Sequence, residues 1–273
     1  MKKHTLMLND FVIEKHVKNA LYEDIGFGDI TTDSIISKDK TCIASLNTRE
    51  DGVLCGVEVF KKVFEILNKN VKTEFYFNDG DLIKKGEKIA QIKGSAKAIL
   101  TGERTALNYL QKLSGISTNT YQYVEAIKNY KANVVDTRKN TPGFRIFEKY
   151  AVLKGGGSLH RFNLSDCVML KDNHIKYAGS IIKAVQLVKS QISHAHKIEV
   201  ECDDIKQVIE ALKAKVDIIM LDNMEINDIE KSVKLINDNA IIEVSGKVTL
   251  NNIVEIAKTN VDIISTSSLI NKA

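Results

Sequence analysis

The sequence predicts an α/β protein in which an N-terminal α/β (α+β) domain precedes an incomplete parallel α/β barrel of the TIM-like kind. Two observations carry this prediction. Between about residues 130 and 268, short β-branched runs alternate with amphipathic helical patterns, which is typical of a parallel sheet buried on both faces. The first 115 residues lack that alternation and mix helical with extended patterns. We therefore expect domains at 1–115 and 116–273.

The N-terminal domain is expected to begin with a helix and to continue in short β-elements. Extended patterns cover 42–50, 52–59 and 72–77, and the stretch 77–94 alternates apolar and polar residues around glycine turns. This last stretch resembles a swinging-arm carrier domain, but the tight turn that holds a modified lysine in such domains has no counterpart here. We interpret the domain as a β-rich structural lid.

A helix is expected at 98–112, where apolar residues recur with the helical period. Gly102 lies inside this helix, where glycine costs about 1 kcal/mol relative to alanine. Its presence therefore predicts that a neighbouring element packs closely at this point. Gly115 is expected to end the helix.

Six strands are expected in the barrel domain because six β-branched runs each lead into polar residues. In chain order the runs are ANVVD, CVML, KIEV, VDIIML, AIIEV and VDIIS. Their spacing favours a barrel or near-barrel. A doubly wound open sheet is the alternative, but no GxGxxG pattern follows any of these runs.

Composition argues against several classes of function. No run approaches the ~18 apolar residues of a membrane helix, and the first residues resemble an amphipathic helix more than a signal peptide. The four cysteines form no CxxC pair, so we expect reduced thiols, no structural metal and a cytoplasmic protein. A net charge of +4, spread along the chain, does not suggest nucleic acid as a partner.

Charged residues follow the ends of successive expected strands, where α/β barrels carry their active sites. Loop solvation explains any one such residue, but a series of cations and carboxylates at successive ends is harder to explain that way. Cations gathered in one cavity repel one another unless anions enter, and two carboxylates suit Mg²⁺ held against a phosphate or the hydroxyls of a ribose. The site is therefore expected to hold phosphorylated polyanions. Its candidate residues are Arg138, Lys139, Lys171, Glu201, Asp222 and Ser245.

Three further features bear on this site. A triple glycine at 155–157 precedes His160 and Arg161, two potential anion donors. The pair Ser245-Gly246 lies between a strand and a helix, where backbone N–H groups can bind a phosphate. Arg104 lies on the expected helix of the first domain and is, taken alone, interpreted as a surface or capping arginine.

In chain order, seven stretches of this sequence resemble the quinolinate phosphoribosyltransferase family, also called nicotinate-nucleotide pyrophosphorylase. The resemblance covers nearly the whole chain, and its most specific parts are DTRKNTPGFR and GGGSLHR. The stretches are ALYEDIGFGDITTDSI (20–35), GERTALNYLQKLSGIST (102–118), DTRKNTPGFRIFEKYAVLKGGGSLHR (136–161), MLKDNHI (169–175), IEVEC (198–202), DIIMLDNM (217–224) and EVSGKVT (243–249).

This resemblance implies a reaction and an assembly. The family transfers the ribose 5-phosphate of phosphoribosyl pyrophosphate to the ring nitrogen of quinolinate, releasing pyrophosphate and carbon dioxide and forming nicotinate mononucleotide for NAD synthesis. It also implies a homodimer in which the N-terminal domain of one subunit covers the barrel mouth of the other. Assembly beyond a dimer is left open.

The resemblance further implies roles for individual residues. Catalysis would involve Lys139, Lys171, Glu201 and Asp222, with Mg²⁺ carried in on the phosphoribosyl pyrophosphate near the two carboxylates. Quinolinate would be bound by Arg104 donated in trans, Thr137, Arg138, His160, Arg161 and Lys171. Phosphoribosyl pyrophosphate would be bound by Lys139, Glu201, Asp222, Ser245, Gly246, Lys247, Thr266, Ser267 and Ser268.

The sequence departs from the family pattern at three positions and leaves alternatives open. Lys247 and Ser267 replace glycines, and Asn271 replaces a histidine. These changes motivate one alternative, a degenerate paralogue that binds a phosphorylated ligand without turnover. A nicotinate-type phosphoribosyltransferase is a second alternative, although the number of cations favours a dicarboxylate. A carrier module, suggested only by residues 79–94, is a third.

Overall fold

The computed structural model describes residues 6–273, which form two compact units. The N-terminal unit comprises the chain up to Tyr121, together with Pro142–Gly156 and Ala273. The C-terminal unit comprises Gln122–Thr141 and Gly157–Lys272. No helix in the described part of the chain is both long and apolar enough to span a membrane.

The N-terminal unit combines antiparallel strands with helices, as predicted. One sheet has the strand order β1-β5-β3, and a second pairs β2 with β4. The strands are β1 (Thr41–Asn47), β2 (Gly52–Val53), β3 (Lys72–Phe75), β4 (Leu82–Ile83) and β5 (Lys88–Ser95). The helices are α1 (Asp10–Ile25), α2 (Ile30–Ile35), α3 (Val57–Leu67), α4 (Ala96–Ala126) and α5 (Arg145–Lys154).

The structure corrects the extended segment expected at 52–59, because its second half begins helix α3. Gly56 precedes the helix with a left-handed φ of 106°, which glycine adopts without steric cost. The Asp79 carboxylate oxygen Oδ1 accepts hydrogen bonds from the backbone N–H groups of Gly56 (2.8 Å) and Val57 (3.0 Å). The helix is therefore capped by a side chain distant in the sequence, which a local pattern does not reveal.

Helix α4 confirms the helix expected at 98–112 but continues beyond Gly115, where an end was expected. Leu113 and Ile116 on either side of this glycine are fully buried, and their packing outweighs the modest cost of glycine inside a helix. Gly102 lies where close packing was expected. A Cβ atom there would lie only 2.7 Å from Cδ1 of Leu67 on α3.

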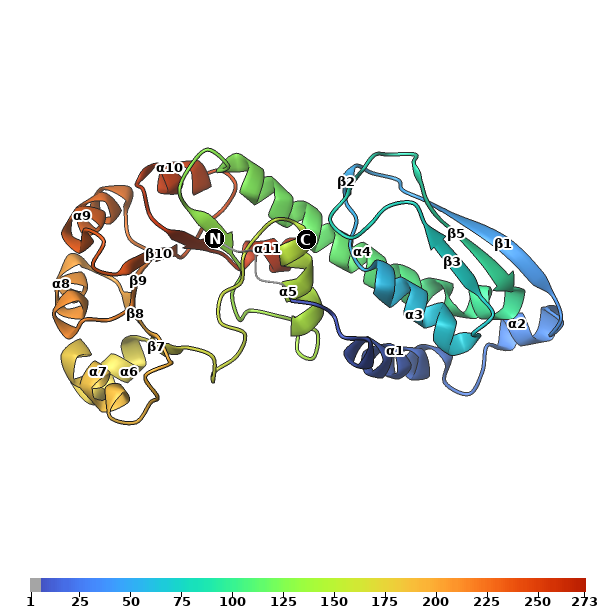
Figure 1. The fold of residues 1–273 in the computed structure, drawn as a ribbon, viewed down its shortest axis with the longest axis horizontal. Helices are drawn as coiled ribbons and strands as arrows, with labels where there is room; N and C mark the ends of the chain where they lie inside the picture. Colours follow the sequence, from blue (N-terminus) through green and yellow to red (C-terminus); the bar gives the residue numbers. More distant parts are fainter. Residues whose placement is uncertain (1–5) are drawn as a thin grey trace. The chain divides into compact units, whose positions relative to one another are not determined.

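The C-terminal unit contains six parallel strands, and each lies within or across one of the six predicted runs. They are β6 (Asn133–Val135), β7 (Val168–Leu170), β8 (Ile198–Cys202), β9 (Ile218–Asp222), β10 (Ile241–Ser245) and β11 (Ile263–Ser265). Helices follow the strands, and α6 to α9 form an outer layer around β7 to β10 (Figure 1). The helices are α6 (Asp172–Ala178), α7 (Ile181–Lys189), α8 (Ile205–Ala214), α9 (Ile226–Ile236), α10 (Ile253–Lys258) and α11 (Ser268–Asn271).

The strand order identifies an incomplete barrel. Strands β7 to β11 neighbour one another in chain order, and the first strand, β6, then pairs with the last, β11. A doubly wound sheet instead grows outward in both directions from a central strand. Beside β6 the ladder is reduced to one isolated bridge, Val135 to Ser158, so the barrel is open between β6 and β7.

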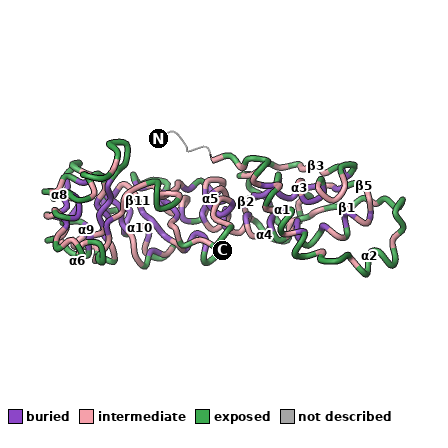
Figure 2. The backbone as a smooth tube through the Cα atoms, turned by 90° about the horizontal axis from the view of Figure 1, so that it is seen from below, coloured by how far each residue is buried: buried purple, intermediate pink, exposed green. Residues whose placement is uncertain are grey.

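Most of the barrel strands are buried along their length. The central residues of β8, β9 and β10 are buried, whereas α6 on the outside contains no buried residue (Figure 2). Val200, Ile219 and Ile264 have no exposed surface. The strands therefore form a packed core, and polar residues at their carboxyl ends are left to build a site.

Candidate active site

A cavity of about 640 Å³ lies at the carboxyl ends of the barrel strands. It contains every predicted site residue of the C-terminal unit, brought together from the ends of the strands and from the loops that follow them. The predicted residues in its lining are Thr137, Arg138, Lys139, His160, Arg161, Lys171, Glu201, Asp222, Ser245, Gly246, Lys247, Thr266, Ser267 and Ser268.

Arg104, the remaining predicted residue, is exposed on α4 of the N-terminal unit. The residues that line the cavity belong to the C-terminal unit. Arg104 is therefore not part of the cavity wall formed by the described residues of the same chain.

Lys171 and Glu201 form an ion pair at the ends of β7 and β8. These strands are adjacent and parallel, with Leu170 in register with Val200, so the next residue of each strand reaches the same edge. The Lys171 ammonium contacts Glu201 Oε2, and the Lys171 side chain remains 45% exposed while that of Glu201 is 16% exposed. The pair therefore places one cation and one anion on the cavity wall before any ligand binds.

Asp222 and Ser245 are in register at the ends of β9 and β10. Asp222 Oδ2 accepts a hydrogen bond from the Asn223 side-chain amide at 2.6 Å, and the Asn223 backbone N–H donates to the Ser245 carbonyl at 3.0 Å. Asn223 also packs against Gly246, where a Cβ atom would lie 2.4 Å from its Oδ1. With a φ of 92°, Gly246 is a position that only glycine fills without strain.

The loops after β10 and β11 are joined by hydroxyl groups. Thr266 Oγ1 donates to the Val248 carbonyl at 3.1 Å and accepts from the Ser268 backbone N–H at 3.1 Å. Lys247, in the loop after β10, lines the cavity, is exposed and has a left-handed φ of 50°. A lysine in this conformation is unusual, because left-handed backbone costs a residue with a Cβ roughly 1–2 kcal/mol.

Thr137 and His160 hold the loops on the other side of the cavity. The Thr137 hydroxyl oxygen accepts the Lys139 backbone N–H at 3.0 Å, which shapes the turn after β6. The His160 backbone N–H donates to the buried Asp136 carboxylate at 2.9 Å, which ties the loop after the triple glycine to the end of β6. Arg161 Nη1 then donates to the Cys167 carbonyl at 2.8 Å.

Two buried glutamates, which the sequence analysis did not single out, face His160. Nε2 of His160 lies 3.4 Å from Glu199 and 3.4 Å from Glu243. Burial lowers the pKa of His160, but hydrogen bonds to the two carboxylates outweigh burial, and the net effect is a raised pKa that the three coupled groups share. Burial raises the pKa of Glu199. A signal was present in the sequence, since an acidic residue inside a β-branched strand that is buried on both faces needs a partner.

Charge in the cavity is predominantly positive. Its lining contains five basic side chains, Arg138, Lys139, Arg161, Lys171 and Lys247, against the two carboxylates of Glu201 and Asp222. Such a surplus is unfavourable in the free protein and is relieved when anions bind. The fold and this site define the class: an α/β-barrel protein with a predominantly basic cavity at the carboxyl ends of its strands, a charge pattern typical of sites for anionic ligands.

Comparison with known families narrows this class. The model of the quinolinate phosphoribosyl transferase C-terminal domain matches residues 116–273, and the model of the N-terminal domain of that family matches residues 29–114. A probable nicotinate-nucleotide pyrophosphorylase [carboxylating] of Bacillus subtilis is 40% identical over 94% of this chain and 89% of its own length. The Synechocystis protein of the same description is 42% identical over 96% of this chain and 90% of its own length.

Solved structures agree with these relatives. The crystal structure of NadC from Streptococcus pyogenes has a TM-score of 0.95 at 42% identity, covering 98% of this chain and 94% of that one. The structure of a nicotinate-nucleotide pyrophosphorylase from Francisella tularensis has a TM-score of 0.94 at 38% identity, covering 98% of this chain and 95% of that one. The chain belongs to the quinolinate phosphoribosyl transferase family.

Proposed function

We propose that this chain transfers the 5-phosphoribosyl group of phosphoribosyl pyrophosphate to quinolinate with decarboxylation, forming nicotinate mononucleotide, carbon dioxide and pyrophosphate for NAD synthesis. Relatives about 40% identical to it over about nine tenths of their own length are described as probable nicotinate-nucleotide pyrophosphorylases [carboxylating]. The observation that carries the proposal is the cavity itself, in which five cations surround two carboxylates. Both substrates are polyanions, so their binding neutralises this surplus.

Quinolinate is the substrate that matches the arginines of the cavity. Its two carboxylates are neutralised by Arg138, Arg161 and Lys171, because a guanidinium binds a carboxylate through paired hydrogen bonds while lysine acts as a point charge. Thr137 and His160 line the same wall. Nicotinate, with one carboxylate, would leave more of this positive charge uncompensated.

Phosphoribosyl pyrophosphate occupies the opposite part of the cavity. Glu201 and Asp222 accept hydrogen bonds from the ribose hydroxyls, and Lys139 and Lys171 face phosphate groups. The 5-phosphate lies among the small residues and the lysine of the last two loops, Ser245, Gly246, Lys247, Thr266, Ser267 and Ser268.

The chemistry needs no protein nucleophile. As pyrophosphate leaves, positive charge develops on the ribose, and the carboxylates of Glu201 and Asp222 stabilise it. Lys139 and Lys171 stabilise the negative charge of the leaving group, and the cations around quinolinate hold its ring nitrogen in line for attack. The new bond makes that nitrogen positive. When carbon dioxide leaves the neighbouring ring carbon, the electron pair of the broken bond stays on that carbon, where the positive nitrogen stabilises it until the carbon takes up a proton from water.

Mg²⁺ is proposed to enter with the pyrophosphate group. Glu201 and Asp222 provide the carboxylate oxygens that Mg²⁺ prefers. Among residues 6–273, however, they belong to no group of three potential ligands, whereas Mg²⁺ takes six oxygens. The pyrophosphate and water would supply the rest, and the ion would serve to neutralise the leaving group.

A homodimer with a shared site is proposed from the surface of the N-terminal unit. Large apolar side chains are exposed on and beside α1 and α2, among them Phe11, Tyr22, Phe27, Ile30 and Ile35. They are close together in the sequence, and contiguous exposed apolar patches mark interaction sites, which supports this proposal. In the dimer, Arg104 of one subunit joins the quinolinate pocket of the other. A cytoplasmic location is proposed as well, since all four cysteines are free thiols.

The proposal is tested by incubating the purified protein with phosphoribosyl pyrophosphate, Mg²⁺ and either quinolinate or nicotinate, and measuring nicotinate mononucleotide by chromatography. We expect product from quinolinate alone. Product from nicotinate alone would establish the nicotinate-type enzyme. Binding of phosphoribosyl pyrophosphate without product from either acid would identify a degenerate paralogue.

A further inference from the structure

Two buried glutamates lie one layer below the candidate active site. Glu199 on β8 and Glu243 on β10 each stand two residues before a cavity-lining residue of the same strand, Glu201 and Ser245 respectively. Side chains two positions apart on a strand point to the same face, about 6.5 Å apart along the strand. The glutamates therefore face the barrel interior directly beneath the cavity, and they are only 0% and 1% exposed.

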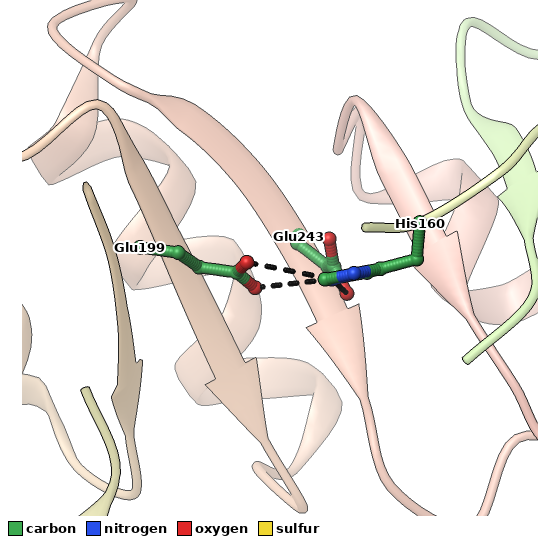
Figure 3. Close-up of side chains that lie close together, drawn as sticks. All are labelled: His160, Glu199 and Glu243. Atoms are coloured by element: carbon green, nitrogen blue, oxygen red, sulfur yellow. Dashed lines mark hydrogen bonds and ion pairs between the residues drawn. The ribbon is translucent and has the colours of Figure 1, made fainter. Parts of the chain in front are cut away.

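Both carboxylates turn toward one nitrogen of His160. Both oxygens of Glu199 lie 3.4 Å from Nε2, as does Oε1 of Glu243. Figure 3 shows the His160 side chain pointing toward the Glu199 and Glu243 side chains, with dashed lines joining the ring to their carboxylates. The ring is thus held from β8 and β10, while its loop is held by the hydrogen bond from the His160 backbone N–H to Asp136.

The other ring nitrogen determines the tautomer. His160 Nδ1 accepts the backbone N–H of Arg161 at 2.7 Å, and an imidazole nitrogen accepts only when it carries no proton. The proton of the neutral ring is therefore on Nε2 and points at the glutamates. One N–H cannot fully compensate two buried carboxylates whose ligand atoms lie within 4.8 Å of each other and of the ring. Burial raises the pKa of Glu199, although the nearby His160 and Arg161 oppose it, so we expect the two carboxylates to share a further proton.

This arrangement has one net negative charge, the same as an imidazolium between two carboxylates. The raised pKa at His160 is a property of the three coupled groups and not of the ring alone. Because Nδ1 accepts the Arg161 N–H, the additional proton is expected on a carboxyl group and not on the ring. Neither ring nitrogen then points a hydrogen at the cavity. His160 acts on the site through its neighbour, Arg161, whose guanidinium is aimed by the Cys167 carbonyl (2.8 Å) and Met169 Sδ (3.5 Å).

We propose that Glu199 and Glu243 are positioning residues for the reaction: together they hold the His160 ring with Nε2–H turned inward, and thereby fix the Arg161 backbone at the quinolinate side of the cavity. This inference rests on the proposed function only for the identity of the substrate. The same three side chains are also ligand types that a divalent cation accepts, and the experiments below distinguish a cation from a proton.

The first experiment uses the unaltered protein and ¹⁵N-labelled histidine. Long-range ¹H–¹⁵N spectra distinguish a protonated from an unprotonated ring nitrogen, and the His160 signals are identified by their loss in His160→Gln. We expect Nδ1 unprotonated and Nε2 protonated at neutral pH. Protons on both nitrogens, or on Nδ1 alone, would overturn the assignment. Stoichiometric metal in the purified protein that is lost in Glu243→Gln would overturn it in favour of a cation site.

The second experiment measures Glu199→Gln and Glu243→Gln, with Glu230→Gln, an exposed glutamate on α9, as the matched control. We expect each buried variant to raise the KM for quinolinate by about tenfold or more, which is the scale measured for side chains that orient metal-binding histidines. The KM for phosphoribosyl pyrophosphate should change much less. Unchanged kinetics in a folded variant, or equal increases in both KM values, would contradict the proposal. If the variants do not fold, the spectra of the unaltered protein still decide it. If quinolinate is not a substrate, those spectra are unaffected, so the two failures can be told apart.

Discussion

The Lys171 ammonium contacts the Glu201 carboxylate across the ends of β7 and β8, so the free protein holds a cation and an anion together where both substrates are proposed to bind. Each partner keeps the other from bearing an uncompensated charge on the cavity wall. A phosphate or carboxylate that approaches Lys171 competes with Glu201, which then becomes available to a ribose hydroxyl. The pair is thus arranged to exchange its internal contact for contacts with substrate.

Removing Lys171 tests this arrangement. We expect Lys171→Ala to lower kcat/KM by about 10²- to 10³-fold, the scale for removing one preorganised charge or donor. Steady-state kinetics with both substrates measure the effect. The matched control is Lys176→Ala, because Lys176 forms an exposed ion pair with Asp172 at 3.6 Å on α6, and such surface pairs contribute little. Equal losses in both variants would show that the effect is not specific to the cavity.

Arg104 is expected to act in the site of the partner subunit. Arg104→Ala and Lys171→Ala should each be nearly inactive, but a mixture after subunit exchange should regain activity. At equal amounts, half of the dimers are hybrids and each hybrid has one intact site of two, so recovery should approach about a quarter of full activity. Arg49→Ala, an exposed arginine of the same unit, should stay active. Confirmed exchange without recovery would exclude the shared site.

Lys247 is expected to bind the 5-phosphate. Replacing it with glycine removes one charge from the cavity and also suits the left-handed backbone. We therefore expect Lys247→Gly to raise the KM for phosphoribosyl pyrophosphate while leaving the melting temperature equal or higher. Lys215→Gly is a matched control, because Lys215 is also a lysine with a left-handed backbone, with a φ of 53°, but lies outside this cavity. A KM that falls in Lys247→Gly would show that the lysine obstructs the phosphate.

His16 is expected to make stability depend on pH. Its Nδ1 lies 2.6 Å from the Tyr109 hydroxyl, and the ring packs against Phe144 and Phe147. Burial lowers the pKa of His16 in the folded protein from the ordinary value of 6.5. The unfolded chain therefore binds a proton more readily, so this stability is fully present above pH 6.5 and is lost as the pH falls through the folded value.

Urea unfolding at pH 7.5 and pH 5.5 measures this dependence. We expect His16→Phe to reduce the difference in unfolding free energy between the two pH values. The exposed His194, changed to phenylalanine in the same way, should leave that difference as it is. An undiminished difference in His16→Phe would assign the pH dependence to other groups.

Much of the barrel and of its site could be predicted from the sequence, because the signals are local. Each strand is a β-branched run with polar residues after it, and parallel strands bring their carboxyl ends to one edge. That logic places Lys171, Glu201 and Asp222 together without knowledge of any contact. It did not foresee helix α3, whose N-terminus depends on Asp79, nor the continuation of α4 through Gly115, which depends on buried neighbours.

The sequence by itself determined the alternation of strands and helices, the charges at the strand ends and the family to which they point, since these depend on periodicity and residue order. Only the tertiary structure decided which residues meet. Strand register sets Asp222 beside Ser245, the approach of Asn223 requires glycine at 246, and the barrel interior brings Glu199 and Glu243 to one ring nitrogen of His160. Such contacts join segments far apart in the chain, and their geometry follows from how the barrel is curved and packed, which no local pattern specifies.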